Sequence, residues 1–146
     1  MEIDWELKFL DFLIAGGIVL LAILIIVARY FYLKSKTSEI DKKFFQERWK
    51  QIAALLGLGK EMNYKLAVIE ADKLLDEALK LMYLPGATTF ERLKFATYKF
   101  PRLKHSWWAH RVRNEVVHNV HYTLKYNEAE KVLELIKKAL KELDVL

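Results

Sequence analysis

The chain contains no cysteine, and among its 146 residues there are only two prolines and five glycines. Without cysteine it has no disulfide, no thiolate metal ligand and no thiol nucleophile, and the composition agrees with a reducing compartment. Few prolines and glycines favour long elements joined by short loops. A glycine-rich phosphate loop is also excluded, because Gly57 and Gly59 lack the following glycine and lysine of such loops.

Acidic residues are missing from one long stretch, between Glu91 and Glu115. Residues 1–33 hold two of the 24 Lys/Arg and four of the 19 Asp/Glu, so residues 34–146 carry a net charge of +7. The acid-free stretch contains seven cations: Arg92, Lys94, Lys99, Arg102, Lys104, Arg111 and Arg113. Aromatic residues are interspersed among them: Phe95, Tyr98, Phe100, Trp107 and Trp108.

This mixture of cations and aromatic rings is typical of three kinds of surface. A groove for single-stranded nucleic acid needs cations for the phosphates and rings for the bases. A surface that lies on anionic lipid needs the same residue types. The third interpretation is a solvated face above a few core aromatics. Composition alone leaves all three open.

One long hydrophobic run is present near the N-terminus. Residues 12–28 contain no charged or strongly polar side chain, and Arg29 follows them. A helix needs roughly 20 residues to cross the hydrocarbon core, so we expect a transmembrane helix over residues 12–33, with Arg29 reaching back to the headgroups. Trp5 and the aromatic residues 30–32 are expected at the two interfaces.

The flanks of this run favour a retained anchor and set its orientation. A cleaved signal peptide begins with positive charge, whereas residues 1–11 hold four acids and one lysine. Lysines follow the run at Lys34, Lys36, Lys42 and Lys43. The positive-inside rule then puts the C-terminus in the cytoplasm. We expect a single-pass inner-membrane protein with a short extracytoplasmic N-terminus, residues 1–11.

Helical patterns dominate the rest of the chain, without a competing strand pattern or an internal repeat. The fold class is predicted as all-α, an N-terminal transmembrane helix followed by a cytoplasmic bundle of four to five helices. A juxtamembrane linker helix capped by Ser38 is expected within residues 34–59, and the bundle within residues 60–146. Its helices are predicted over residues 60–82, 88–98 and 104–121 and from residue 127 onward.

Local signals inside the bundle predict one helix start and two core faces. Thr88 and Glu91 match a capping box. The core face of the helix over residues 60–82 is predicted to contain Leu66, Ile69, Leu74, Ala78 and Leu81. The last helix carries a cleaner stripe: Ala129, Val132, Leu133, Ile136, Leu140 and Leu143.

The predicted helix over residues 104–121 holds the most reactive side chains. At about 100° per residue, His110, Asn114 and His118 stack on one face, and His121 falls beside them. Arg113 lies about 140° around the helix from His118, at the edge of an apolar arc. This arc consists of Ala109, Val112, Val116 and Val120.

A cation beside an apolar arc is costly unless it is paired, so Arg113 has two expected arrangements. It pairs with a carboxylate of the helix over residues 60–82, or its side chain curls toward Asn114 and His118 and forms a phosphate pocket. The carboxylate candidates are Glu70, Asp72 and Asp76. The histidine row has an alternative too, an ordinary polar face without a chemical task.

Neither a metal nor another cofactor is expected. His118 and His121 are three residues apart and could share a zinc ion, but no cysteine and no suitably spaced carboxylate completes the ligand set. A serine nucleophile is also unsupported, because Ser106 is not set in a nucleophile elbow.

The segment AHRVRNEVVH, preceded by EADKLLDEAL, resembles domains of the HEPN superfamily (higher eukaryotes and prokaryotes nucleotide-binding), as found in small membrane-anchored bacterial proteins. The family signature is an arginine, four to six residues and a histidine, often with Asn, Asp or His directly after the arginine. Arg113, Asn114 and His118 occupy those places. The resemblance covers roughly residues 60–146 and does not include the hydrophobic run.

The resemblance implies a metal-independent endoribonuclease whose two protomers join their motifs into one site. Arg113 would hold the scissile phosphate, His118 would transfer a proton, and Asn114 would orient His118. Supporting roles fall to His110, His121 and Asp72. The expected phosphate contacts are Arg92, Lys94, Lys99, Arg102, Lys104 and Arg111.

The expected partners are therefore a second copy of the chain, RNA, the membrane, and an antitoxin or other protein. Two further hypotheses belong to other classes. In one, the bundle is a non-catalytic, membrane-tethered interaction or scaffold domain in which the Arg–His pair fixes helices together. In the other, residues 92–113 bind anionic lipid.

Overall fold

Helices are the only regular elements in the part of the chain that the structure describes. A computed structural model describes the backbone of residues 3–146 and the side chains of residues 12–31 and 42–146. The chain divides into two compact units, Met1–Ile40 and Asp41–Leu146. This confirms an all-α fold with an N-terminal apolar helix and a helical bundle.

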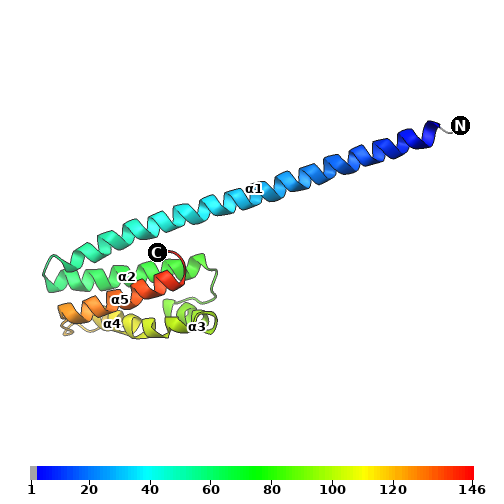
Figure 1. The fold of residues 1–146 in the computed structure, drawn as a ribbon. Helices are drawn as coiled ribbons and strands as arrows, with labels where there is room; N and C mark the ends of the chain where they lie inside the picture. The colour runs from blue at the N-terminus through cyan, green and yellow to red at the C-terminus, as the bar shows by residue number, and fades with distance from the viewer. Residues whose placement is uncertain (1–2) are drawn as a thin grey trace. The chain divides into compact units, whose positions relative to one another are not determined.

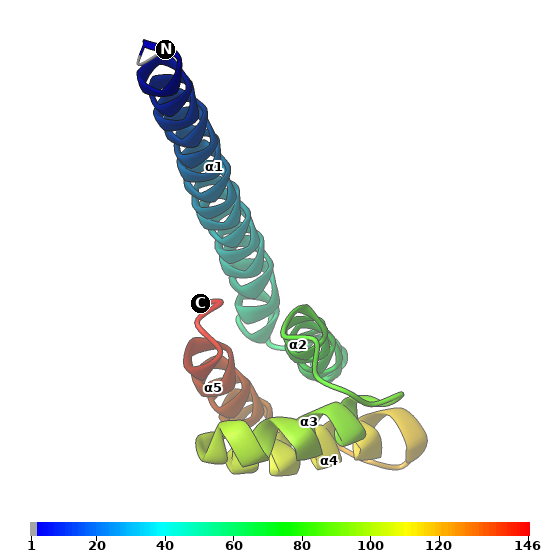
Figure 2. The ribbon, with the colours of Figure 1, turned by 90° about the vertical axis from the view of Figure 1, so that its right-hand side faces the viewer.

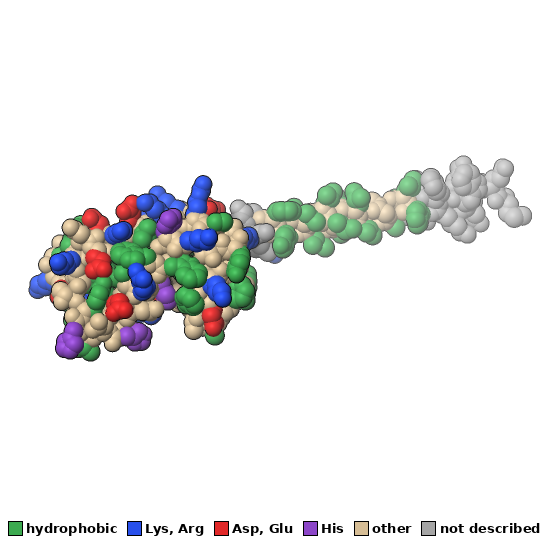
Figure 3. Space-filling model, turned by 90° about the horizontal axis from the view of Figure 1, so that it is seen from below, with side chains coloured by type: hydrophobic (Ala, Val, Ile, Leu, Met, Phe, Trp, Pro, Cys, Tyr) green, Lys and Arg blue, Asp and Glu red, His purple; other side chains and the backbone are tan. Residues whose placement is uncertain are grey.

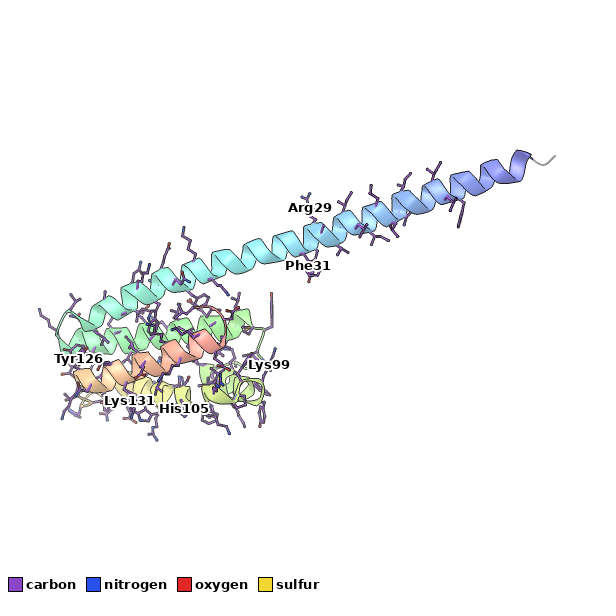
Figure 4. The ribbon with its side chains drawn as sticks, in the orientation of Figure 1. Arg29, Phe31, Lys99, His105, Tyr126 and Lys131 are labelled. Carbon is purple, nitrogen blue, oxygen red and sulfur yellow. The ribbon has the colours of Figure 1, made fainter. Side chains whose placement is uncertain are left out.

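The first helix, α1, runs from Ile3 to Leu56. Its segment Phe12–Phe31 is long and apolar enough to cross a membrane, by length and composition, and none of its side chains is buried in the protein. Figure 4 shows Arg29 and Phe31 on opposite sides of this helix. The expected interface residues Trp5 and Tyr32 lie outside the described side chains.

The linker helix expected over residues 34–59 is not a separate element. Because α1 is continuous through Ser38, that residue is not the N-cap of a new helix. The final turns of α1 belong to the second compact unit and contribute Phe45, Trp49 and Ile52 to its core. The bundle therefore starts near residue 41, earlier than the predicted boundary at residue 60.

The remaining helices complete a bundle (Figure 1). They are α2 (Glu61–Leu81), α3 (Thr89–Lys99), the 3-10 helix η1 (Pro101–His105), α4 (Ser106–His118) and α5 (Tyr126–Glu142). Figure 2 shows α2 and α5 side by side, with α3 and α4 crossing next to them. α4 packs on both α2 and α5, so side chains on its inner face meet α2.

The core confirms one predicted face and corrects the other. All six residues of the α5 stripe are buried. On α2, however, Leu66 and Leu81 are exposed and Ile69 is only half-buried. The buried face of α2 is instead formed by Ala67, Val68, Ala71, Leu74, Leu75, Ala78 and Leu79. α2 is apolar over a wide arc, and its small alanines let neighbouring helices approach one side of it.

Helix α4 is shorter than predicted. It ends at His118, so His121 follows the helix and does not stack beside His118, and Val120 is outside the apolar arc and exposed. α5 begins at Tyr126, after Lys125 as N-cap, which makes no side-chain cap. The last helix therefore begins one residue before the predicted residue 127, and Asn127 lies inside its first turn.

The start of α3 follows its sequence signal. Glu91 donates its backbone N–H to Thr88 Oγ1 at 3.2 Å, and its carboxylate accepts from the N–H groups of Thr88 and Ala87. This reciprocal exchange confirms the predicted capping box. Gly86 precedes it with φ of 143°, and a Cβ there would lie 2.8 Å from the backbone N of Arg92. The turn therefore requires glycine.

Thr88→Ala is expected to lower the free energy of unfolding by about 1 kcal/mol, because a backbone N–H of the first turn loses its acceptor. This loss is measured by denaturant unfolding, with tryptophan fluorescence as the signal. Thr97→Ala is the control, since the Thr97 hydroxyl only donates to the Lys94 carbonyl of its own helix. Equal effects of the two substitutions would contradict a capping role.

Candidate functional site

The motif residues Arg113 and Asn114 are in direct contact, and His118 is not joined to them. Arg113 Nη1 donates to Asn114 Oδ1 at 3.0 Å. His118 is the last residue of α4 and is exposed. Among the described residues, no hydrogen bond links His118 to either of them. The arginine side chain has thus curled toward Asn114, as one of its two expected arrangements requires, without reaching His118.

Arg113 also takes the other expected arrangement, because it lies against Asp72 of α2. Its Nε is 3.3 Å from Asp72 Oδ2, although the N–H is not aligned with that oxygen for a hydrogen bond. Of the three predicted carboxylate candidates, only Asp72 is within ion-pair distance of Arg113. Glu70 pairs instead with Arg48 and Lys73.

Asp72 holds a second side chain, His110. The Nδ1 atom of His110 lies 2.9 Å from Oδ1 and 3.2 Å from Oδ2 of the carboxylate. Asp72 is 1% exposed and His110 is 8% exposed, so the pair is inside the protein. His110 is therefore not part of a solvated polar face. A buried carboxylate with two basic partners at the α2–α4 contact fixes the rotation of one helix against the other.

A groove runs along the outer side of this network, between α3, η1 and α4. One part, of about 460 Å³, is lined by Phe90, Lys104, Trp107, Trp108, His110, Arg111 and Asn114. The adjoining part, of about 600 Å³, is lined by Lys94, Thr97, Tyr98, Pro101, Lys104 and Trp107. The two parts share Lys104 and Trp107, and none of the acidic side chains that the structure describes lines either part. We call this surface the α3–α4 groove.

Aromatic rings form much of the wall of the groove. Phe90 and Trp107 meet edge to face with their ring centroids 5.2 Å apart. Trp108 is covered on one side by Lys131 of α5, whose Nζ lies 4.9 Å from the ring centroid; Figure 4 labels this lysine. Figure 3, which looks onto the α3–α4 side, shows cations interleaved with hydrophobic side chains. Phe90 was not predicted to line a groove, because its position between Thr88 and Glu91 of the capping box indicated only the start of a helix.

The six cations expected to contact phosphate fall into different places. Lys94, Lys104 and Arg111 line the α3–α4 groove. Lys99, at the end of α3, is exposed, with its Nζ 5.4 Å from the Phe100 ring centroid. Arg102 pairs with Glu142 at 3.3 Å, outside this groove. The acid-free stretch is thus divided among more than one surface.

Arg92 is the clearest departure from the expected phosphate contacts. It is buried, donates from Nε to Asp76 Oδ1 at 2.8 Å and from Nη2 to Oδ2 at 3.0 Å, and also donates to the Gly86 carbonyl. The bidentate pair with Asp76 and the bond to Gly86 hold the guanidinium inside the protein, away from any phosphate at the surface. Arg92 is a structural cation that joins α3 to α2.

Metal ligands do not gather in the described residues, where no three His, Cys, Asp or Glu side chains lie close enough to hold an ion. His121, in the loop after α4, donates its backbone N–H to Asn119 Oδ1 and lies outside the groove lining. A second hollow, between η1 and α5, is lined by Arg102, His105, Leu135, Lys138, Ala139, Lys141 and Glu142.

Comparisons of the chain with family models, with curated proteins and with solved structures found no match. The resemblance to HEPN domains therefore stays a prediction.

Proposed function

We propose that the chain is a membrane-anchored RNA-binding protein whose bundle acts as a dimeric, metal-independent endoribonuclease. Phe12–Phe31 would be its single span, with the basic bundle on the cytoplasmic side of the inner membrane. The HEPN resemblance of Arg113, Asn114 and His118 supplies the cleavage hypothesis, in which a second protomer completes the site.

The proposal of RNA binding rests on the α3–α4 groove. Its wall offers three cations, Lys94, Lys104 and Arg111, with the rings of Tyr98 and Trp107 between them. Cations neutralise phosphates, and aromatic faces stack on unpaired bases. Since no described acidic side chain lines the groove, a polyanion would meet cations there and no like charge from these residues. These properties favour single-stranded RNA as the ligand.

Two motif residues, Asn114 and His118, lie along the same side of α4 as the groove. Trp107, Arg111, Asn114 and His118 follow each other at spacings of four, three and four residues, which places them within about 60° of one another around the helix. RNA bound in the groove along α4 would therefore extend toward His118. The Arg113 side chain is 25% exposed, so a phosphate at this surface would still meet part of it.

Reversing the charge of Lys104 and Arg111 together is expected to weaken RNA binding about 100-fold, because each charge-assisted hydrogen bond contributes roughly 1.5 kcal/mol. The salt dependence of binding should also become shallower, by about one unit for each phosphate that the variant no longer neutralises. Fluorescence anisotropy of a labelled single-stranded RNA with the detergent-solubilised full chain measures both quantities.

The matched control reverses Lys50 and Lys137, two exposed lysines outside the groove. This variant has the same net charge, so it separates a groove effect from a general charge effect. Equal weakening by both double variants would contradict the groove as the binding site. Binding to anionic vesicles in place of RNA would support the lipid hypothesis instead.

A second candidate function, a membrane-tethered scaffold, is favoured by the Asp72 network. Asp72 is held by both His110 and Arg113, so the arginine of the motif also serves as a structural ion partner. A pure scaffold leaves RNA intact in EDTA, whereas the proposed ribonuclease cleaves it there to products with cyclic phosphate ends. This cleavage assay decides between the two.

A further inference from the structure

His110 has the geometry of a proton acceptor, although it lies outside the Arg–His signature. Its ring lines the α3–α4 groove on one side and meets Asp72 on the other. The other histidines have no comparable setting: His105 lies on η1 beside the second hollow, His118 ends α4, and His121 lies in the loop that follows. Among the described side chains, only His110 combines a buried carboxylate partner with a place in the groove wall.

The contact with Asp72 determines which ring nitrogen carries the proton. The Asp72 carboxylate also faces the permanently charged Arg113 at 3.3 Å, and a carboxylate can only accept hydrogen bonds. The Nδ1 atom, 2.9 Å away, must therefore be the protonated nitrogen of the neutral ring. Nε2 then has a lone pair and can accept a proton.

Nε2 is open to the groove. Within the described side chains, the one buried polar side-chain atom without a partner is Arg113 Nε, and no hydrogen bond reaches His110 Nε2. Because Nδ1 faces Asp72, Nε2 lies on the opposite edge of the ring, toward the groove. Lys104, Arg111 and Trp107 also line this part of the groove, so a nucleotide beside the ring would meet two cations and an aromatic face.

From this arrangement we infer that His110, oriented by Asp72, is the general base for cleavage of RNA bound in the groove. The inference rests on the proposed ribonuclease function and adds a catalytic residue that the signature does not contain. Asp72 is a positioning residue, because it acts through the imidazole.

The reaction balances without a co-reactant. His110 Nε2 takes the proton of the RNA 2′-hydroxyl, and the 2′-oxygen forms a bond to the adjacent phosphorus while the bond from phosphorus to the 5′-oxygen breaks. Water in the open groove protonates the leaving 5′-oxygen, and His110 Nε2 returns its proton to that water, so no net proton is consumed. The products are a 2′,3′-cyclic phosphate and a 5′-hydroxyl. Lys104 and Arg111 would offset the charge that builds on the phosphate oxygens.

His110→Asn is the decisive variant. The asparagine amide N–H can take the place of Nδ1–H and keep the bond to Asp72, but it offers no titrating nitrogen to the groove. We expect RNA cleavage in EDTA by the detergent-solubilised full chain to fall about 100-fold or more. Binding of an uncleavable 2′-deoxy oligonucleotide should be unchanged, and the rise of the residual cleavage rate with pH should disappear.

The matched control is His105→Asn, which changes an exposed histidine outside the groove and should cleave like the wild type. Cleavage by His110→Asn at the wild-type rate, or with the wild-type pH profile, would overturn the inference while the ribonuclease function stands. A wild-type chain that binds RNA but leaves it intact would overturn both the cleavage proposal and this one. The two failures are therefore distinguishable.

Discussion

Asp72→Ala is expected to lower the free energy of unfolding by about 3 kcal/mol or more. The carboxylate is 1% exposed and holds both His110 and Arg113, so its removal leaves a buried imidazole N–H without an acceptor and a partly buried cation without a counter-charge. Breaking a buried ion pair by removing one member typically costs about 3–5 kcal/mol. Because Arg113 is 25% exposed and can turn toward water, we expect the lower end of this range.

Denaturant unfolding of the detergent-solubilised full chain, followed by tryptophan fluorescence, measures this loss. The control is Glu134→Ala, which removes a glutamate that is 60% exposed and pairs with Lys138 at 2.6 Å. Exposed pairs contribute little, so this variant should unfold like the wild type. A loss for Asp72→Ala no larger than that of the control would show that the α2–α4 contact does not depend on the network.

Arg92→Ala is expected to have the second large effect, a loss of about 3 kcal/mol. The arginine side chain is 9% exposed and joins α3 to Asp76 of α2 by two hydrogen bonds, with a third to the Gly86 carbonyl. Asp76 keeps one cation, Lys80 at 2.7 Å, so the cost stays near the lower limit for a broken buried pair. The same unfolding measurement applies, and Arg102→Ala is the control, since Arg102 is 83% exposed.

The same substitution is expected to change how stability depends on pH. Burial of Asp76 opposes its ionisation, but hydrogen bonds from Lys80, Arg92 and Thr89 outweigh burial and hold its pKa below the usual 3.8. An aspartate with a lowered pKa stabilises the fold fully above pH 3.8, and this contribution is lost as the pH falls through the lower pKa of the folded state.

Removal of Arg92 takes away one cause of the lowered pKa of Asp76, so the fall in stability below pH 4 should be shallower in Arg92→Ala than in the wild type. Unfolding curves recorded at a series of acidic pH values test this. Identical slopes in the two proteins would mean that the guanidinium does not control ionisation of Asp76.

Features that depend on neighbours along the chain were predictable. The capping box of Thr88 and Glu91 and the buried stripe of α5 both follow from spacings of three and four residues. The apolar segment Phe12–Phe31 was visible from composition alone. The continuity of α1 was not, because Ser38 fits a helix interior as well as an N-cap and only the packing of Phe45 and Trp49 shows where the bundle begins.

The candidate site was predictable only in part. Sequence reasoning limited the partner of Arg113 to three carboxylates and included Asp72, and it expected Lys94, Lys104 and Arg111 at a phosphate-binding surface. Arg92 was expected at the same surface and is instead buried with Asp76. A cation in an acid-free stretch has no acid nearby in sequence, but a helix that packs on it can supply one.

The sequence by itself determined the helices, the hydrophobic run and the excess of positive charge, since these arise from residue types and from spacings within one helical turn. Tertiary structure decided which side chains meet. Asp72 and His110 are 38 residues apart, and Asp76 and Arg92 are 16 apart. Such contacts depend on how each helix is rotated against its neighbours, and that rotation is set by the packing of the whole core.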